Sequence, residues 1–104
     1  MSEKLEFDIV KNEGEVEVTL TGNLDATNAN QLLEEMKKLI GNQIDKISFF
    51  AAELEYIASA GLRVIIFTKQ KIGKDADVYL ISPQDEVKDV IKMSGLDNFL
   101  IIEE

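Results

Sequence analysis

The chain lacks the two residue types that supply most nucleophilic and metal-binding chemistry in proteins. It contains no cysteine and no histidine. Without cysteine there is no disulfide, no thiolate nucleophile and no thiolate metal site, and the composition suits a reducing compartment. Without histidine the commonest general base and metal ligand is missing, so the serine–histidine and cysteine–histidine arrangements of hydrolases cannot form. We therefore expect no enzyme and no cofactor.

Two weaker kinds of site are also unconvincing. Carboxylates close in sequence occur at Glu53 with Glu55 and at Asp85 with Glu86, but such pairs are far more typical of a solvated surface than of a metal site. The glycines are scattered and form no phosphate-binding loop. We assign no metal and no phosphate-loop nucleotide site.

Long apolar runs and excess positive charge are missing as well. No segment approaches the roughly 20 apolar residues that span a bilayer, and the first ten residues have no signal-peptide pattern. Twenty acidic residues against 11 basic ones give a net charge of -9, which repels nucleic acid and anionic lipid surfaces. The composition therefore predicts a cytoplasmic protein that neither binds nucleic acid nor inserts into a membrane. Its 104 residues fit a single domain, 1–104.

The hydrophobic periodicity alternates between the two-residue period of strands and the helical period of three to four residues. In chain order it predicts strands over 5–10 and 16–21, a helix over 29–40, a strand over 46–52, a helix over 59–72, a strand over 78–81, a helix over 83–94 and a strand over 99–102. The first two strands form a hairpin. The order β-β-α-β-α-β-α-β predicts an α/β fold in which helices pack against a mixed, mostly parallel sheet of about five strands.

Three local details accompany this prediction. Asp25 or Thr27 can cap the first helix, and Ser82 can cap the third helix with Pro83 at its first position. The segment 46–52 is apolar in both phases, as in a central strand covered on both faces.

Ser59 stands where a strand gives way to a helix, in the stretch YIASAGLRVII, which runs from Tyr56 to Ile66. The ordinary interpretation is an N-cap whose hydroxyl accepts a backbone hydrogen bond. The functional interpretation is a phosphoacceptor, because a helix N-terminus tolerates a phosphate. Gly61 costs about 1 kcal/mol in a helix, which indicates that either another protein or a packed strand approaches the backbone there.

Three separated segments resemble one family. They are LTGNLDATNA at 20–29, YIASAGLRV at 56–64 and MSGLDNF at 93–99. Together they span most of the chain and are similar to the bacterial anti-sigma-factor antagonists built on the STAS domain. The resemblance implies the STAS fold, a mixed sheet flanked by helices.

The resemblance also implies a phosphorylation-controlled binding switch. In that family the unphosphorylated antagonist sequesters an anti-sigma factor that is also a serine kinase, and a serine phosphatase reverses the phosphorylation. By position, Ser59 is the implied phosphoacceptor. The implied partner-binding surface comprises Asp25, Ala26, Thr27, Ser59, Gly61, Leu62 and Arg63.

Ala58 departs from the family pattern, which often has an acidic residue directly before the serine. This favours an alternative in which the domain is a scaffold or an accessory subunit of a transporter or sensory complex and is never phosphorylated. A nucleotide sensor using the same helix N-terminus is a third hypothesis. For Arg63 we favour simple solvation of the helix, and for Val64 and Phe67 a place in the core.

Overall fold

The predicted order of elements is confirmed by the computed structural model, which describes residues 4–104. The strands are β1 (Leu5–Asn12), β2 (Glu15–Leu24), β3 (Lys46–Ile57), β4 (Asp77–Ile81) and β5 (Ile101–Glu103). The α-helices are α1 (Ala29–Lys37), α2 (Ser59–Phe67) and α3 (Asp85–Met93). A π-helical turn, Thr68–Ile72, extends α2 to Gly73, and a 3-10 turn, Leu96–Asn98, precedes β5.

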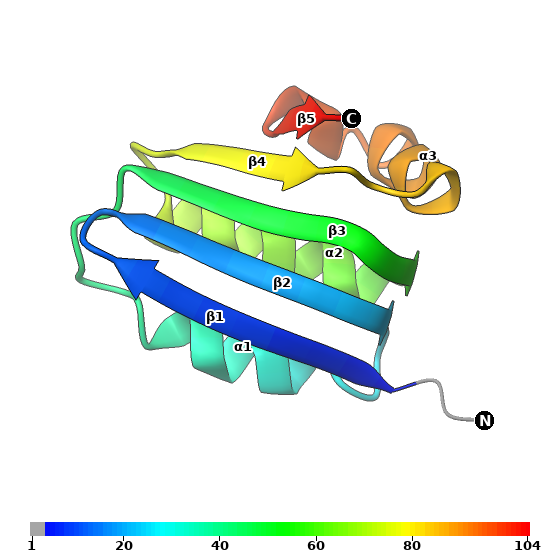
Figure 1. Ribbon diagram of the computed structural model, residues 1–104, viewed down its shortest axis with the longest axis horizontal. Helices are drawn as coiled ribbons and strands as arrows, with labels where there is room; N and C mark the ends of the chain where they lie inside the picture. Colours follow the sequence, from blue (N-terminus) through cyan, green and yellow to red (C-terminus); the bar gives the residue numbers. More distant parts are fainter. Residues whose placement is uncertain (1–3) are drawn as a thin grey trace.

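The strands form one mixed sheet in the order β1-β2-β3-β4-β5 (Figure 1). β1 runs antiparallel to β2 as the predicted hairpin, and the other neighbours are parallel. Helices α1 and α2 lie side by side against one face of the sheet, and α3 packs against β3 where that strand extends past β4. The opposite face carries no helix in the part of the chain that the structure describes (Figure 1). None of the helices within residues 4–104 has the length and apolar character needed to cross a bilayer.

The core fills the space between the sheet and the helices. Its fully buried side chains include Leu20 of β2, Phe49 of β3, Leu32 of α1, Ile65 of α2 and Ile91 of α3. Each of these has a relative exposure of 0%. The strand and helix periods in the sequence therefore point the expected faces inward.

The central strand is confirmed in position but not in its surroundings. β3 lies between β2 and β4, and Ile47, Phe49 and Ala51 are buried beneath the helices. The expectation that both faces of this strand are covered is wrong, because Phe50 is only half-buried and Ala52 is exposed on the open side. β3 is apolar on both of its faces because strands flank it on both sides, and not because a second layer of helices covers the open face.

Several helix and strand ends differ from the prediction. Asn28, and not Asp25 or Thr27, occupies the N-cap of α1. The N-cap of α3 is Gln84, so Ser82 and Pro83 precede that helix instead of starting it. β5 begins at Ile101, two residues later than expected. Phe99, which was expected in this strand, lies in the preceding turn and is 65% exposed.

Two apolar residues of the predicted helix stripes face solvent. Ile40 is 51% exposed because α1 ends at Lys37, before the stripe is complete. Ile66 is 37% exposed, while Val64 takes the inward position and Phe67 packs partly against the core. The core assignment of Val64 is thereby confirmed.

Candidate functional site

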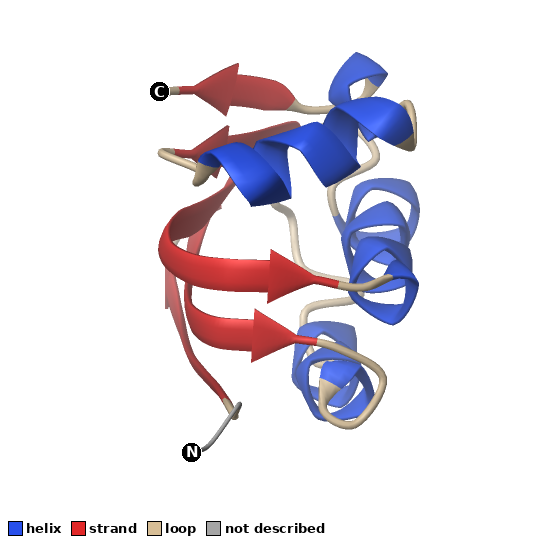
Figure 2. Cartoon of the chain, turned by 90° about the vertical axis from the view of Figure 1, so that its right-hand side faces the viewer, coloured by secondary structure: helices blue, strands red, loops and turns tan. Residues whose placement is uncertain are grey.

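The two segments singled out by the sequence meet at one edge of the sheet. β2 and β3 are parallel and in register at their ends, where Leu24 pairs with Ile57. The backbone N–H of Ala58 donates to the carbonyl of Leu24 at 2.9 Å. The loop after β2, which carries Asp25, therefore lies beside the start of α2, which carries Ser59. Figure 2 looks onto this edge, where both strands run into their loops and then turn back into helices.

The loop between β2 and α1 is held by its own hydrogen bonds. The backbone N–H and the hydroxyl of Thr27 both donate to Oδ1 of Asp25, at 2.9 and 2.6 Å. Both bonds lower the pKa of the Asp25 carboxyl below its ordinary value, and the bond from the Thr27 hydroxyl contributes most. Asp25 therefore keeps its negative charge at neutral pH and down into the acid range.

Asn28 organises this loop and was not identified from the sequence. Its side chain is buried, at 8% exposure. Its Oδ1 accepts from the N–H of Asp25 at 3.0 Å, and its Nδ2 donates to the carbonyl of Asn23 at 2.8 Å. The available signal was an asparagine directly before the first residue of an apolar helical stripe, a common N-cap pattern.

Ser59 does not cap α2. The N-cap is Ala58, in an extended conformation, and its carbonyl accepts the first intrahelical bond from the N–H of Leu62 at 3.0 Å. Ser59 is the first helical residue and is exposed. Its hydroxyl makes no hydrogen bond with any residue that the structure describes. The N-cap interpretation is therefore wrong, and the exposed Ser59 has no side-chain hydrogen bond to any of residues 4–104.

Gly61 permits close packing inside the protein. It is buried, and a Cβ atom added there would lie 2.7 Å from Cγ of Leu24 and 2.8 Å from Cγ1 of Ile57. Of the two alternatives, the group that approaches Gly61 is thus the core at the ends of the two strands. The next residue, Leu62, is half-buried and packs against the same core.

Of the remaining predicted residues, Ala26 and Arg63 line a shallow groove between α1 and α2, and Thr27 belongs to the adjoining β2–α1 loop. Ala26, Thr27 and Arg63 are exposed, and the sequence-based preference for a solvated Arg63 fits this position. The groove has a volume of ≈ 190 Å³ and is lined by Ala26, Ala29, Asn30, Leu33, Ala60, Arg63 and Val64. The edge thus combines a fixed carboxylate, a free hydroxyl and a small apolar depression.

The whole of this arrangement falls within one family. The model of the STAS domain matches residues 6–104. The chain belongs to the STAS-domain family. The match extends from the first strand to the last residue, so both segments of the edge lie inside this STAS domain.

Solved structures agree with this STAS fold at low sequence identity. An anti-sigma factor antagonist from Mycobacterium paratuberculosis superposes with a TM-score of 0.86 at 17% identity, covering 99% of this chain and 88% of that one. SpoIIAA, an anti-sigma factor antagonist solved in its unphosphorylated form, gives 0.81 at 18%, covering 93% and 87%. Phosphorylated SpoIIAA, described as a Bacillus cell fate determinant, gives 0.74 at 18%, covering 93% and 90%. At these identities the likeness establishes the fold alone.

Replacing the buried glycine of the STAS edge should destabilise the domain. Gly61→Ala gains about 1 kcal/mol of helix propensity, but overpacking against Leu24 and Ile57 costs about 1–3 kcal/mol. We expect a net loss of up to about 2 kcal/mol in the free energy of unfolding. Urea denaturation measures it, with Ser59→Ala in the same helical turn as the control. A Gly61→Ala protein more stable than wild type would contradict the close packing.

The start of α2 and the start of α1 should respond differently to loss of their polar side chains. Ser59→Ala removes a hydroxyl without a partner, so the free energy of unfolding should change by less than about 0.5 kcal/mol. Asn28→Ala removes two hydrogen bonds from a buried position and should cost about 1–3 kcal/mol. Thermal or urea unfolding distinguishes the two. A loss near 1 kcal/mol for Ser59→Ala, the usual cost of a missing N-cap, would restore the cap interpretation.

Proposed function

We propose that this STAS domain is an anti-sigma-factor antagonist whose binding is controlled by phosphorylation of Ser59. While Ser59 is unphosphorylated, the edge formed by the β2–α1 loop and the start of α2 binds and sequesters an anti-sigma factor that is also a serine kinase. The observation that carries the proposal is the exposed Ser59 hydroxyl, free of any hydrogen bond within residues 4–104, beside the Asp25 loop. The antagonist structures with the same fold, one of them phosphorylated, support it.

The position of Ser59 suits a phosphate chemically. The backbone N–H groups of Ser59, Ala60 and Gly61 precede the first intrahelical bond, which Leu62 makes, and the helix dipole favours negative charge at this end. A phosphate there removes no structural hydrogen bond, because the serine hydroxyl makes none. The modified protein can therefore keep its fold while its surface changes.

The size of the charge change is adequate for a switch. A phosphate adds about -1.5 to -2 charge next to Asp25, which its hydrogen bonds from Thr27 keep ionised. Burying such a group in an interface without a cationic partner costs several kcal/mol. Moving a complex from almost fully bound to almost fully free takes about 5.5 kcal/mol. One phosphate is thus of the right order, and a serine phosphatase would restore binding.

Ala58 supports one alternative, a STAS scaffold or accessory subunit of a transporter or sensory complex that is not phosphorylated. The methyl group of Ala58 offers a kinase no charge to recognise before Ser59. In the structure the backbone N–H of Ala58 donates to the carbonyl of Leu24, and its carbonyl accepts from the N–H of Leu62. In this alternative the same edge binds a partner permanently.

The experiment mixes the purified protein with ATP and the serine-kinase anti-sigma factors encoded in the same genome. Intact mass reports phosphate transfer, and gel filtration with fluorescence titration reports the complex. We expect one phosphate on wild type and none on Ser59→Ala, which should still bind. Ser59→Asp should bind at least about tenfold more weakly, because it places a charge at the interface.

Ser94→Ala is the matched control, since Ser94 is an exposed serine at the far end of α3 and should leave both readouts unchanged. Phosphate on Ser94 instead of Ser59 would overturn the assignment. Tight binding by Ser59→Asp, together with no phosphate on wild type, would favour the permanent scaffold.

A further inference from the structure

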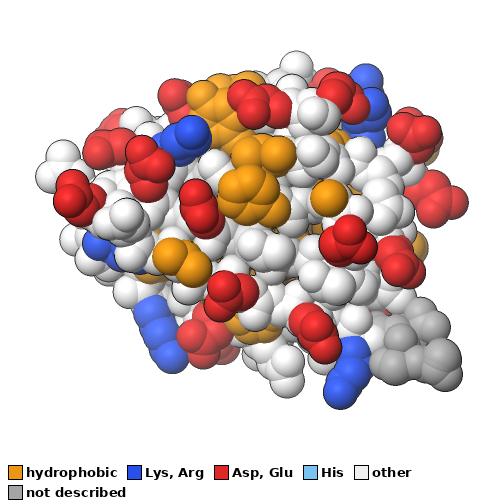
Figure 3. Space-filling model, viewed as in Figure 1, with side chains coloured by type: hydrophobic (Ala, Val, Ile, Leu, Met, Phe, Trp, Pro, Cys, Tyr) orange, Lys and Arg blue, Asp and Glu red, His pale blue; other side chains and the backbone are white. Residues whose placement is uncertain are grey.

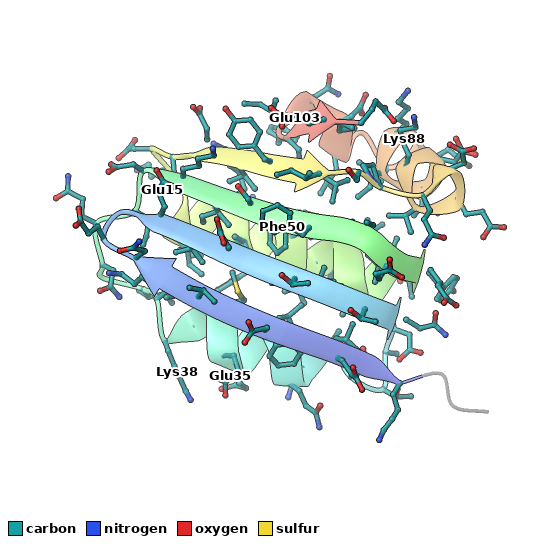
Figure 4. The ribbon with its side chains drawn as sticks, in the orientation of Figure 1. Glu15, Glu35, Lys38, Phe50, Lys88 and Glu103 are labelled. Carbon is teal, nitrogen blue, oxygen red and sulfur yellow. The ribbon has the colours of Figure 1, made fainter. Side chains whose placement is uncertain are left out.

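The open face of the sheet carries a compact apolar patch. Side chains alternate between the two faces of a strand, so the partners of outward positions also point outward. Phe50 of β3 pairs with Ile81 of β4, and Tyr79 of β4 pairs with Ile101 of β5. These four residues are called the apolar patch below. Ile101 is 43% exposed and the other three are half-buried, and Phe50 stands near the middle of the face (Figure 4).

Acidic side chains border this apolar patch. The outward positions of β1 and β2 carry Glu6, Asp8, Glu15 and Glu17, and Asp77 and Glu103 flank the patch on β4 and β5. Figure 3 shows hydrophobic surface in the upper part of this face with acidic groups around it. Among the outward positions that pair across the sheet, one basic residue is found, Lys46. Its Nζ lies 4.9 Å from the centre of the Tyr79 ring.

Among the described residues, no ion pair joins the carboxylates of β1 and β2 to a lysine or arginine. Within residues 4–104 the ion pairs join Glu34 to Lys37, Glu35 to Lys38 and Glu104 to Lys88, all away from the β1–β2 half of the face. The face is therefore divided. Its β3–β5 half carries the apolar patch, with Lys46, Asp77 and Glu103 around it. Its β1–β2 half carries the four carboxylates, of which Glu15 is paired with Lys46 in the strand register, together with Val10, Asn12, Thr19 and Thr21.

The apolar patch and the carboxylates beside it determine which kind of partner can bind the open face. A second copy of the chain would set acidic surface against acidic surface, and nucleic acid or anionic lipid would be repelled. A helix with apolar residues along one stripe and Lys or Arg beside it matches both halves. Sheets commonly bury a face beneath such helices. We propose that the open face docks a basic amphipathic helix of a partner protein, with its apolar stripe over the apolar patch and its basic side over β1 and β2.

This surface is separate from the edge that carries Ser59. The edge lies at the carboxyl ends of β2 and β3 and faces the viewer in Figure 2, whereas the apolar patch lies on the broad face seen in Figure 1. The inference therefore does not depend on the proposed function. Binding at the open face should be the same for wild type and Ser59→Asp.

The test is a nuclear magnetic resonance titration of the isotope-labelled chain with a synthetic leucine–lysine peptide. The leucines recur at i, i+3, i+4 and i+7, so that they form a stripe on a helix. Two control peptides keep the same composition in shuffled order or replace lysine by glutamate. We expect amide shifts at the outward positions of the strands with the first peptide, and at least about tenfold weaker binding of both controls.

Variants locate the site. Phe50→Thr and Ile81→Thr keep a residue suited to a strand and should each weaken binding about tenfold, whereas Met93→Thr, 86% exposed outside the face, should not. Glu17→Lys should weaken binding more than Asp89→Lys, which changes the net charge equally but lies on α3. Circular dichroism and the unfolding midpoint check that each variant folds, and the surface-charge variants test the site even if Phe50→Thr is unstable.

Three outcomes would overturn the proposal. Equal affinity for the shuffled peptide, or shifts scattered over the acidic surface, would indicate attraction by charge alone. Unchanged binding by Phe50→Thr and Ile81→Thr would remove the apolar patch from the site. Dimers of the wild-type chain in sedimentation that Phe50→Thr dissociates would identify a second copy as the occupant.

Discussion

The parallel pairing of β2 with β3 is the constraint on which the rest of the structure depends. It is the most extensive strand pairing in the sheet and runs from Glu15–Lys46 to Leu24–Ile57. Because both strands end at the same edge, two loops that are distant in sequence become neighbours, joined by the hydrogen bond from Ala58 to Leu24. The same pairing presents Leu24 and Ile57 together to α2, and Gly61 lets the helix sit directly on them. The position of Ser59 thus follows from core packing several residues away.

Much of this fold could be predicted from the sequence because its signals are local. Alternating residues in β1 and β2, and apolar stripes in α1 to α3, determine which faces are buried, and they gave the element order correctly. Asp25 and Ser59 could be joined into one site only through the family resemblance. Periodicity does not say which strand ends lie side by side, whereas the register of β2 against β3 does.

The helix starts could not be predicted, because several neighbouring residues can each serve as the N-cap. Ser82, Gln84, Asp25, Thr27 and Asn28 can all serve near helix starts, and tertiary hydrogen bonds decide among them. Ser82 donates its N–H to Glu103 of β5, and Gln84 donates from its side chain to Ala52 of β3. The open face could not be foreseen for a related reason. From the sequence, Phe50 is predicted to be a core residue both when a helix covers it and when only neighbouring strands surround it.

The edge and the open face suit different modes of control. In the proposed switch, phosphorylation changes the charge at Ser59, and the effect of that charge reaches about one Debye length, about 8 Å at physiological salt. The stretch of β3 from Phe50 to Ile57 spans roughly 20 Å at about 3.3 Å per extended residue, so a phosphate at the edge is screened before it reaches the apolar patch. The open face holds carboxylates and apolar groups. Binding there would persist through the phosphorylation cycle, so a domain of this size could stay attached to one protein while it exchanges another at its edge.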